Sequence, residues 1–324
     1  MDKLDKRHFK VKKVINISDL KEGDIVGTSD YVVNNNEKFI QFEYIRSKRS
    51  ATKVEITPGI HKAISTMAGL QLVDAGFKND KLLESFDNTK EIIEKVDCFL
   101  RNMDIYKELG RDDVKRCMLL YGPPGTGKTA SVSVLAKKYV ADGETAVLIW
   151  KTDVIDADSM KDFISNFEYK GVKKLFFIAE DIGGVEVEDA RIASKSSLLS
   201  LLDNQEKTFT IPTLIIATTN FPGMFLANIA NRPQRFDDKI KMDYPSSEAR
   251  KELFKFIGKD RVTNEDIEYV AESKFKQFTP AHLQEIVIRS AIYEQAIKKT
   301  MDDMVEEIEQ YNKGYTDRNS VGIK

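Results

Sequence analysis

An eight-residue segment of the chain has the residue types and the spacing needed to bind phosphate groups. It reads GPPGTGKT and fits the pattern G-x-x-x-x-G-K-[ST] in full. Glycines let backbone N–H groups turn inward around phosphates, and the amino end of a following helix adds partial positive charge. We expect Lys128 to reach the β- and γ-phosphates of a nucleotide and Thr129 to ligate Mg²⁺. The residues expected to bind the nucleotide are Gly122, Pro123, Pro124, Gly125, Thr126, Gly127, Lys128, Thr129 and Ala130.

An acidic pair, Glu180 and Asp181, ends an apolar stretch farther along the chain. Alone, such a pair is usually a solvated strand end. A phosphate-binding loop, however, needs one carboxylate near the metal and another that orients or deprotonates the attacking water. We assign Glu180 to Mg²⁺ and Asp181 to the water, and the reverse assignment remains open.

Three polar side chains beyond the acidic pair complete the candidate catalytic set. Asn220 follows the apolar stretch 213–219, and ligands of open α/β sheets gather at the carboxyl ends of strands. Taken alone, Asn220 could simply start a turn. Arg232 and Arg235 lie in the segment NRPQRFD, which could be a solvated surface loop. The phosphate loop supplies too little positive charge for a transition state, and an arginine supplied from outside is worth about 10³–10⁵ in rate.

Apolar segments that alternate with amphipathic helices must position these residues. A helix is expected over 89–109, and continuous apolar segments between helices predict a parallel α/β sheet with helices on both faces. The expected strands are 116–121, 146–150, 174–179, 212–218 and 239–242.

Two other regions flank this α/β region of residues 86–243. Residues 1–85 contain short alternating segments such as 39–46 and 52–56, which predict a small β-rich domain that recruits a partner. Residues 244–324 contain only helices and a polar tail. Ser246 or Ser247, Thr263 and Thr279 are expected to cap these helices, because Ser and Thr oxygens accept from the free N–H groups of a first turn.

The composition of the 324-residue chain is that of an ordinary soluble protein. It is 41% hydrophobic and 31% charged, with a formal net charge of −2 and two cysteines without metal-ligand spacing. This balance gives no argument for a nucleic-acid or membrane partner. No apolar stretch approaches the roughly 20 residues that cross a bilayer, and the first ten residues lack the apolar core of a signal peptide. The sequence therefore predicts a cytoplasmic protein.

The motifs GPPGTGKT, the acidic strand end, ATTN and RPQRFD resemble the AAA clade of the AAA+ ATPases in order and approximate spacing. The resemblance covers about residues 86–300. It implies ATP hydrolysis with Mg²⁺, a helical lid formed by the C-terminal region, and a homo-oligomeric ring, usually of six subunits. It also implies that Asn220 is the sensor 1 residue, and that Arg232 and Arg235 are fingers that reach the ATP of the neighbouring subunit.

Some local features resemble one subgroup of the family, and others depart from the family pattern. The segment KVDCFLRNMDIYKELG and the order Glu180 then Asp181 are similar to the mitochondrial AAA translocase that moves folded Rieske protein; soluble bacteriophage AAA proteins are another candidate group. Segment 151–158 has neither the aromatic residue nor the glycine with which many relatives thread unfolded chains. The lid has no arginine near His282, which we expect on the surface of a helix.

Three functions are compatible with this sequence. The leading one is an ATP-driven remodeller of a protein or protein complex. The alternative is a nucleic-acid-associated ATPase, such as a loader, because residues 44–53 interleave basic and aromatic side chains that could follow phosphates. Those charges more often protect an edge strand from aggregation. The third is a scaffold that binds ATP without turnover, which the complete catalytic set argues against.

Overall fold

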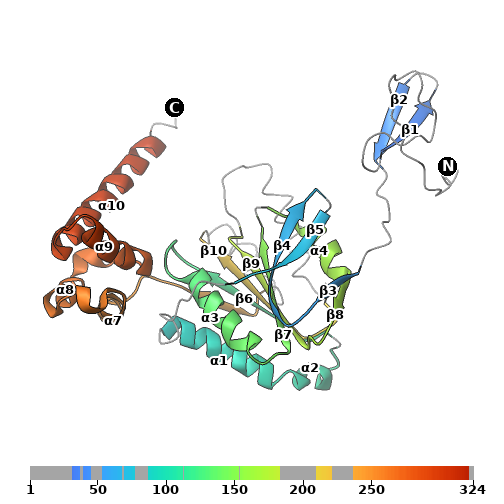
Figure 1. Ribbon diagram of the computed structural model, residues 1–324, viewed down its shortest axis with the longest axis horizontal. Coiled ribbons are helices and arrows are strands. Elements are labelled where there is room, and N and C mark those ends of the chain that lie inside the picture. The colour runs from blue at the N-terminus through green and yellow to red at the C-terminus, as the bar shows by residue number, and fades with distance from the viewer. Residues whose placement is uncertain are drawn as a thin grey trace. The chain divides into compact units, whose positions relative to one another are not determined.

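The computed structural model describes residues 31–36, 39–44, 53–67, 69–76, 87–111, 113–152, 154–182, 209–220 and 236–320 (Figure 1). Contacts divide the chain into two compact units, Met1–Lys53 and Val54–Lys324. In the first unit, β1 (Tyr31–Asn36) and β2 (Phe39–Tyr44) form an antiparallel hairpin, which confirms residues 39–44 of the strand expected over 39–46; residues 45 and 46 lie outside the described residues.

The second unit is built on a seven-stranded sheet in the order β11-β6-β10-β9-β7-β4-β5. Every neighbouring pair is parallel except β4 and β5. All five predicted apolar strands are present, and the α/β class is confirmed. The bounds are β4 (Gly59–Thr66), β5 (Gly69–Asp74), β6 (Lys115–Tyr121), β7 (Thr145–Lys151), β9 (Lys174–Glu180), β10 (Thr213–Thr219) and β11 (Asp238–Lys241).

Strands β4 and β5 extend this sheet, although the sequence analysis assigns them to an amino-terminal domain. β4 pairs in parallel with β7, and β3 (Val54–Ile56) pairs with β8 (Phe167–Tyr169). Ile56 and Ala63 are buried in the same core as the strands of the α/β region. The boundary expected at residue 85 therefore does not coincide with the start of the compact unit, at Val54. Period-two alternation identifies a strand but not the sheet that it joins.

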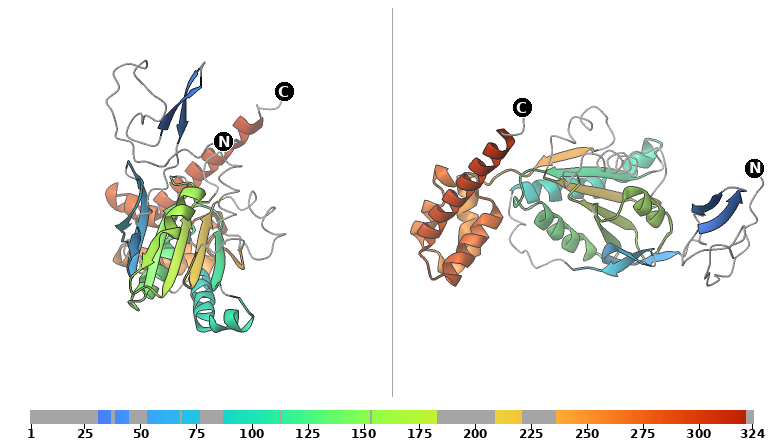
Figure 2. Two further views of the ribbon diagram at one scale, coloured as in Figure 1. Left: turned by 90° about the vertical axis from the view of Figure 1, so that its right-hand side faces the viewer. Right: turned by 90° about the horizontal axis from the view of Figure 1, so that it is seen from above.

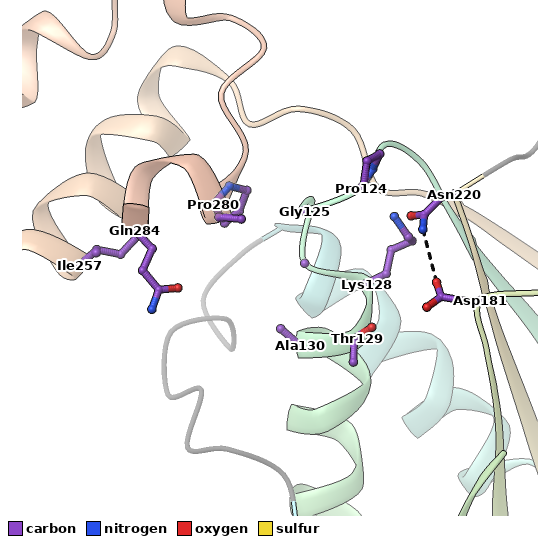
Figure 3. Close-up of a pocket in the computed structure, with 12 residues that line it drawn as sticks. Pro124, Gly125, Lys128, Thr129, Ala130, Asp181, Asn220, Ile257, Pro280 and Gln284 are labelled. Atoms are coloured by element: carbon purple, nitrogen blue, oxygen red, sulfur yellow. Dashed lines mark hydrogen bonds between the residues drawn. The ribbon is translucent and has the colours of Figure 1, made fainter. Parts of the chain in front are cut away.

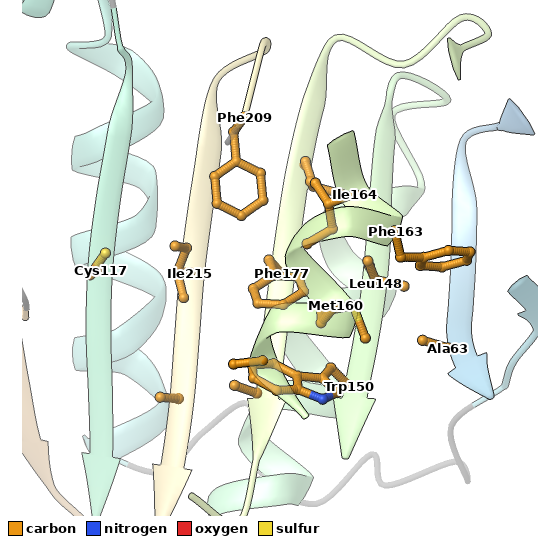
Figure 4. Packing of buried hydrophobic residues seen from close by; sticks show 14 of the residues in the cluster. Ala63, Cys117, Leu148, Trp150, Met160, Phe163, Ile164, Phe177, Phe209 and Ile215 are labelled. Atoms are coloured by element: carbon orange, nitrogen blue, oxygen red, sulfur yellow. The ribbon is translucent and has the colours of Figure 1, made fainter. Parts of the chain in front are cut away.

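Helices cover both faces of the sheet (Figure 2). α1 (Asp87–Arg101) and α3 (Lys128–Val140) pack on one face, while α4 (Ala157–Ser165) packs on the other, against Trp150 and Phe177 (Figure 4). The single helix expected over 89–109 is two helices, because α1 ends at Arg101 and α2 spans Asp104–Glu108. Asn102 Nδ2 donates to the Cys98 carbonyl at 2.7 Å and so competes with continuation of the helix.

Four α-helices and two short 3₁₀ turns form the C-terminal part of the described chain. Its core includes Phe254, Phe275 and Leu283. Ser246 caps α7, and Thr263 and Thr279 take part in capping boxes, as expected. The helical bounds are α7 (Ser247–Gly258), η2 (Lys259–Arg261), α8 (Asn264–Tyr269), η3 (Ser273–Phe275), α9 (Pro280–Ile292) and α10 (Ile297–Ser320).

Helix α10 continues to Ser320 and so includes most of the segment expected to be a polar tail. Met301 and Met304 anchor its first turns in the core, and each further residue then adds one hydrogen bond at little cost. None of the helices in the described ranges has the length and apolar character that a bilayer-spanning helix requires.

Candidate nucleotide-binding site

The loop between β6 and α3 owes its shape to glycines. Gly122, Gly125 and Gly127 have φ values of 152°, 77° and 95°, in the region that only glycine adopts readily. A Cβ atom on Gly122 would lie 2.0 Å from the Met242 carbonyl oxygen, and one on Gly125 would lie 2.8 Å from Thr279 Oγ1. Because Gly127 is the N-cap of α3 and has no side chain to cap it, the first N–H groups of this helix remain available to a ligand.

Lys128 is buried at the start of α3, and its ammonium group turns back over the loop. Lys128 Nζ donates to the carbonyl oxygens of Gly122 at 2.8 Å and Pro123 at 2.7 Å. Burial lowers the pKa of Lys128 to about 8, although the nearby carboxylate of Asp181 opposes this shift. The site therefore holds a cation that is incompletely solvated, which favours binding of an anion.

The acidic pair lies at the end of β9, at the carboxyl end of the sheet, and Glu180 is the last residue of the strand. Asp181 has a left-handed backbone, with φ of 52°, and its N–H donates to Thr218 Oγ1 at 3.0 Å. Its Oδ1 accepts from Asn220 Nδ2 at 3.4 Å (Figure 3). Glu180 is half-buried at the last position of β9. The structure thus brings Asp181, Asn220 and Lys128 together, as adjacent parallel strands require.

A pocket of about 390 Å³ lies where these elements meet. Of the expected residues, Pro124, Gly125, Gly127–Ala130, Asp181 and Asn220 line it, whereas Gly122, Pro123, Thr126 and Glu180 do not. The lining residues are Pro124, Gly125, Gly127, Lys128, Thr129, Ala130, Asp181, Asn220, Ile257, Pro280, Ala281 and Gln284. Arg232 and Arg235 lie outside the described residues.

The pocket also has a wall that the sequence analysis did not assign to it. Ile257, Pro280, Ala281 and Gln284 come from α7 and from the first turn of α9 (Figure 3). The Thr279–Pro280 helix start was the available signal, but nothing in the sequence showed that it faces the glycine loop.

A second pocket of about 210 Å³ adjoins the loop at Thr126. The amino end of α1, the 242–246 linker and the first turns of α7 contribute to it. Its lining residues are Asn88, Thr89, Thr126, Ser131, Met242, Asp243, Tyr244, Pro245, Ser246, Ala249, Leu253 and Pro280. Thr89 and Ser131 share a buried hydroxyl–hydroxyl bond of 3.0 Å, which joins α1 to the phosphate-loop helix. Sequence reasoning missed this pocket because its walls are distant in the chain.

His282 is half-buried and does not lie on an exposed helix face. Its Nδ1 accepts from the Thr279 N–H at 3.1 Å and completes the capping box of α9. Its ring stacks on Phe278, with 5.7 Å between the ring centroids, and burial lowers the pKa of the imidazole. His282 therefore fixes the start of the helix that carries Pro280 and Ala281 to the pocket.

Comparisons with known proteins agree with this geometry. Residues 118–244 match the family described as "ATPase family associated with various cellular activities (AAA)". The chain is 27% identical to ATP-dependent zinc metalloprotease FtsH 2 of Salinibacter ruber, over 64% of this chain and 31% of that protein. It is 31% identical to an AAA-ATPase of Arabidopsis thaliana, over 60% of this chain and 41% of that protein.

A third relative aligns with this chain over a larger share of both sequences. The proteasome-activating nucleotidase of Saccharolobus solfataricus is 27% identical over 82% of this chain and 70% of its own length. The first two relatives, by contrast, are matched over less than half of their length. The family match, residues 118–244, contains the glycine loop and the acidic strand end. The chain therefore contains an AAA+ ATPase domain, the kind of enzyme domain that binds ATP with Mg²⁺ and hydrolyses it.

Proposed function

We propose that the protein is a ring-forming AAA+ ATPase that uses ATP hydrolysis to remodel a protein or protein complex. One observation supports ATPase activity most strongly: the glycine loop, Asp181, Asn220 and the start of α9 meet in one pocket. The names of two relatives, a metalloprotease and a proteasome-activating nucleotidase, support a protein as the object of the work.

The residues present fit MgATP. The uncapped N–H groups at the start of α3 and the buried ammonium of Lys128 suit the β- and γ-phosphates. The Thr129 hydroxyl and the Glu180 carboxylate would hold Mg²⁺, which neutralises phosphate charge when bound. The second pocket, beside Thr89 and Tyr244, adjoins the loop where the nucleoside of a loop-bound triphosphate would extend.

The acidic side of the pocket suits preparation of the attacking water. We assign the role of base to Asp181, because its carboxylate lines the pocket and faces Asn220. Asn220 would hold the water or the γ-phosphate, as the sensor 1 role implies. A base within hydrogen-bond reach of water contributes about 10²–10⁴ in rate.

The pocket is short of positive charge for a transition state. Among its described lining residues, Lys128 is the only lysine or arginine. A cation beyond Lys128 and Mg²⁺ would stabilise the charge that develops in the transition state, and Arg232 and Arg235 are the candidates. We propose that they act on the ATP of a neighbouring subunit, so that only a ring, of six subunits in our expectation, has complete sites.

We propose that the protein does not thread an unfolded partner by means of aromatic side chains. The loop that follows β7 exposes Val154 and contains no aromatic residue or glycine between Lys151 and Asp158. The resemblance of the segment KVDCFLRNMDIYKELG to the translocase of folded Rieske protein supports the same proposal. Movement or rearrangement of a folded partner is therefore the favoured activity.

Mixed rings test the shared site. Lys128→Ala removes the phosphate contact and Arg235→Ala removes a finger, so each homogeneous ring should be inactive. Mixing the two should restore part of the ATPase rate, because some interfaces then pair an intact loop with an intact finger. The matched control mixes Lys128→Ala with the double variant Lys128→Ala/Arg235→Ala, which has no intact loop and should restore nothing. Lack of recovery in rings shown to be mixed would overturn the shared site.

The nature of the partner is tested with the ATP-trapped variant Asp181→Asn. We expect it to retain a protein in the presence of MgATP, whereas Lys128→Ala, which cannot bind ATP, should not. Retention of DNA or RNA instead, lost on nuclease treatment, would favour the nucleic-acid alternative. Of the basic segment 44–53, only Tyr44 and Lys53 belong to the described residues.

A further inference from the structure

The backbone at Asp181 is unusual for a residue with a side chain. Its φ of 52° lies in the left-handed region, where a Cβ atom crowds the following carbonyl oxygen. In the described chain only Lys259 and Glu294 share this feature without being glycine, and they follow the helices α7 and α9. Aspartate and asparagine tolerate this conformation better than other residues. Something must nevertheless hold the backbone there in a catalytic loop.

Thr218 of the neighbouring strand β10 holds it from one side. The paired register of β9 and β10 ends at Ala179 and Ala217. One residue later, Thr218 Oγ1 accepts the N–H of Asp181 at 3.0 Å, and the Thr218 carbonyl accepts the N–H of Ile182 at 2.8 Å. Two successive amides are thus bound to one buried residue, and one of them depends on its hydroxyl.

Thr152, which follows β7 on the other side of β9, holds the carbonyl groups. Thr152 Oγ1 donates to the Glu180 carbonyl at 3.2 Å and lies 3.5 Å from the Asp181 carbonyl. Thr152 is half-buried, and its bonds are longer than that of Thr218. The peptide groups on both sides of Asp181 are therefore bound to Thr218 of β10 and to Thr152, the residue after β7.

We propose that Thr218 is a positioning residue for hydrolysis, which acts through the backbone of Asp181, and that Thr152 makes a smaller contribution of the same kind. With these bonds made, the Asp181 carboxylate faces Asn220 and the pocket. Without the Thr218 hydroxyl, a partly buried N–H loses its acceptor and the left-handed turn loses its main support. This inference rests on the proposed catalytic role of Asp181.

The substitution Thr218→Val tests the proposal, because valine keeps the shape and removes the acceptor. A displacement of the base by about 1 Å is enough to lower the rate roughly 10²-fold, so we expect kcat to fall about 10- to 100-fold. The KM and the affinity for MgATP should stay within about twofold, because the loop side of the pocket is unchanged. Thr218→Ser keeps a hydroxyl and should restore most of the rate. Wild-type kcat in Thr218→Val would overturn the proposal.

Thr213→Val is the matched control. Thr213 is buried at the opposite end of the same strand, and its hydroxyl donates to the Ile211 carbonyl at 2.8 Å. Its replacement also removes a buried hydroxyl bond from β10, so the melting temperature should fall similarly, but kcat should not change. Equal losses of kcat in Thr213→Val and Thr218→Val would assign the effect to stability and contradict positioning.

The double variant separates this inference from the proposed function. If Thr218 acts through Asp181, Thr218→Val should cost nothing further in an Asp181→Asn background, because residues that act as a unit are not additive. A further loss of the same size would contradict the proposal. Normal hydrolysis by Asp181→Asn alone would instead overturn the role of Asp181. An inactive Asp181→Asn beside a normal Thr218→Val would leave that role intact and overturn only the positioning role.

Discussion

Backbone groups form one side of the nucleotide pocket, and side chains form the other. The phosphate side, Gly122–Thr129, is mainly backbone, and its shape depends on glycines beside Met242 and Thr279. The acidic side consists of the side chains of Asp181 and Asn220, and Glu180 precedes them without lining the pocket. One side therefore works through fixed amides and the other through side chains whose direction must be set by hydrogen bonds.

Because of this difference, substitutions on the two sides should change nucleotide affinity and turnover separately. Changes on the phosphate side remove contacts that the bound nucleotide makes in all states, so they should weaken affinity. Changes on the acidic side act on groups needed only for the chemical step, so they should lower kcat.

The largest effect is expected from substitution of Arg232 and Arg235, which lie outside the described residues. Arg232→Ala and Arg235→Ala should leave MgATP affinity nearly intact and lower turnover by up to about 10³–10⁵, or about 4–7 kcal/mol, if a full finger is lost. Steady-state ATPase rates and equilibrium nucleotide binding on the same preparations provide the measurement. A loss of less than tenfold in both variants would remove these residues from the transition state.

The two carboxylates should give unequal effects. Asp181→Asn should bind MgATP and turn it over about 10²–10⁴ times more slowly, because it removes the proposed base. Glu180→Gln should in addition raise the Mg²⁺ concentration needed for half-maximal rate. Titration of Mg²⁺ at saturating ATP measures the turnover rate and the half-maximal Mg²⁺ concentration of each variant. Normal turnover in Asp181→Asn together with ATP trapping in Glu180→Gln would exchange the two roles.

The ammonium of Lys128 should make nucleotide affinity depend on pH. Its pKa is lowered to about 8 by burial, and bound phosphates favour the protonated form, so binding above that pH must take up a proton. Affinity should be nearly constant below pH 7 and should fall about tenfold for each pH unit well above 8. Calorimetry at pH 9 in two buffers of different ionisation enthalpy counts the proton. A flat affinity with no proton uptake would contradict the assigned state of Lys128.

The smallest effect on hydrolysis is expected from removing the first compact unit. Deletion of residues 1–53 ends where the second unit begins, so basal turnover should stay within about twofold. Deletion of residues 1–85 also removes β4 and β5, which exposes the edge of β7 and the apolar core beneath it, and should lower the melting temperature. Comparison of the two truncations by calorimetry measures the difference. Equal stability would contradict the contribution of β4 and β5 to the sheet.

The residues with a local signal could be predicted from the sequence. The glycine loop, the acid at the end of β9 and Asn220 at the end of β10 each depend on a motif and a strand end, and the structure brings them to one edge. Parallel strands between helices also determine the α/β class. These predictions need no knowledge of which distant segments pair.

The remaining features depend on contacts between distant segments. Alternation within β4 could not show that it pairs with β7, and no motif indicates that Gln284 faces the loop. The bond from the Asp181 N–H to Thr218 Oγ1 depends on the register of two strands and on one left-handed residue. Such features follow from tertiary packing, which single-sequence patterns do not encode.

The central claim, that this pocket binds ATP through the glycine loop, is tested most directly by equilibrium binding of MgATP to Lys128→Ala. Each charge-assisted hydrogen bond contributes about 1.5–3 kcal/mol, so loss of the contacts to two phosphates should weaken binding at least about 100-fold. The melting temperature of the nucleotide-free variant checks that the fold is kept. We predict a folded protein with little or no binding. A folded variant that binds MgATP with wild-type affinity would contradict the account.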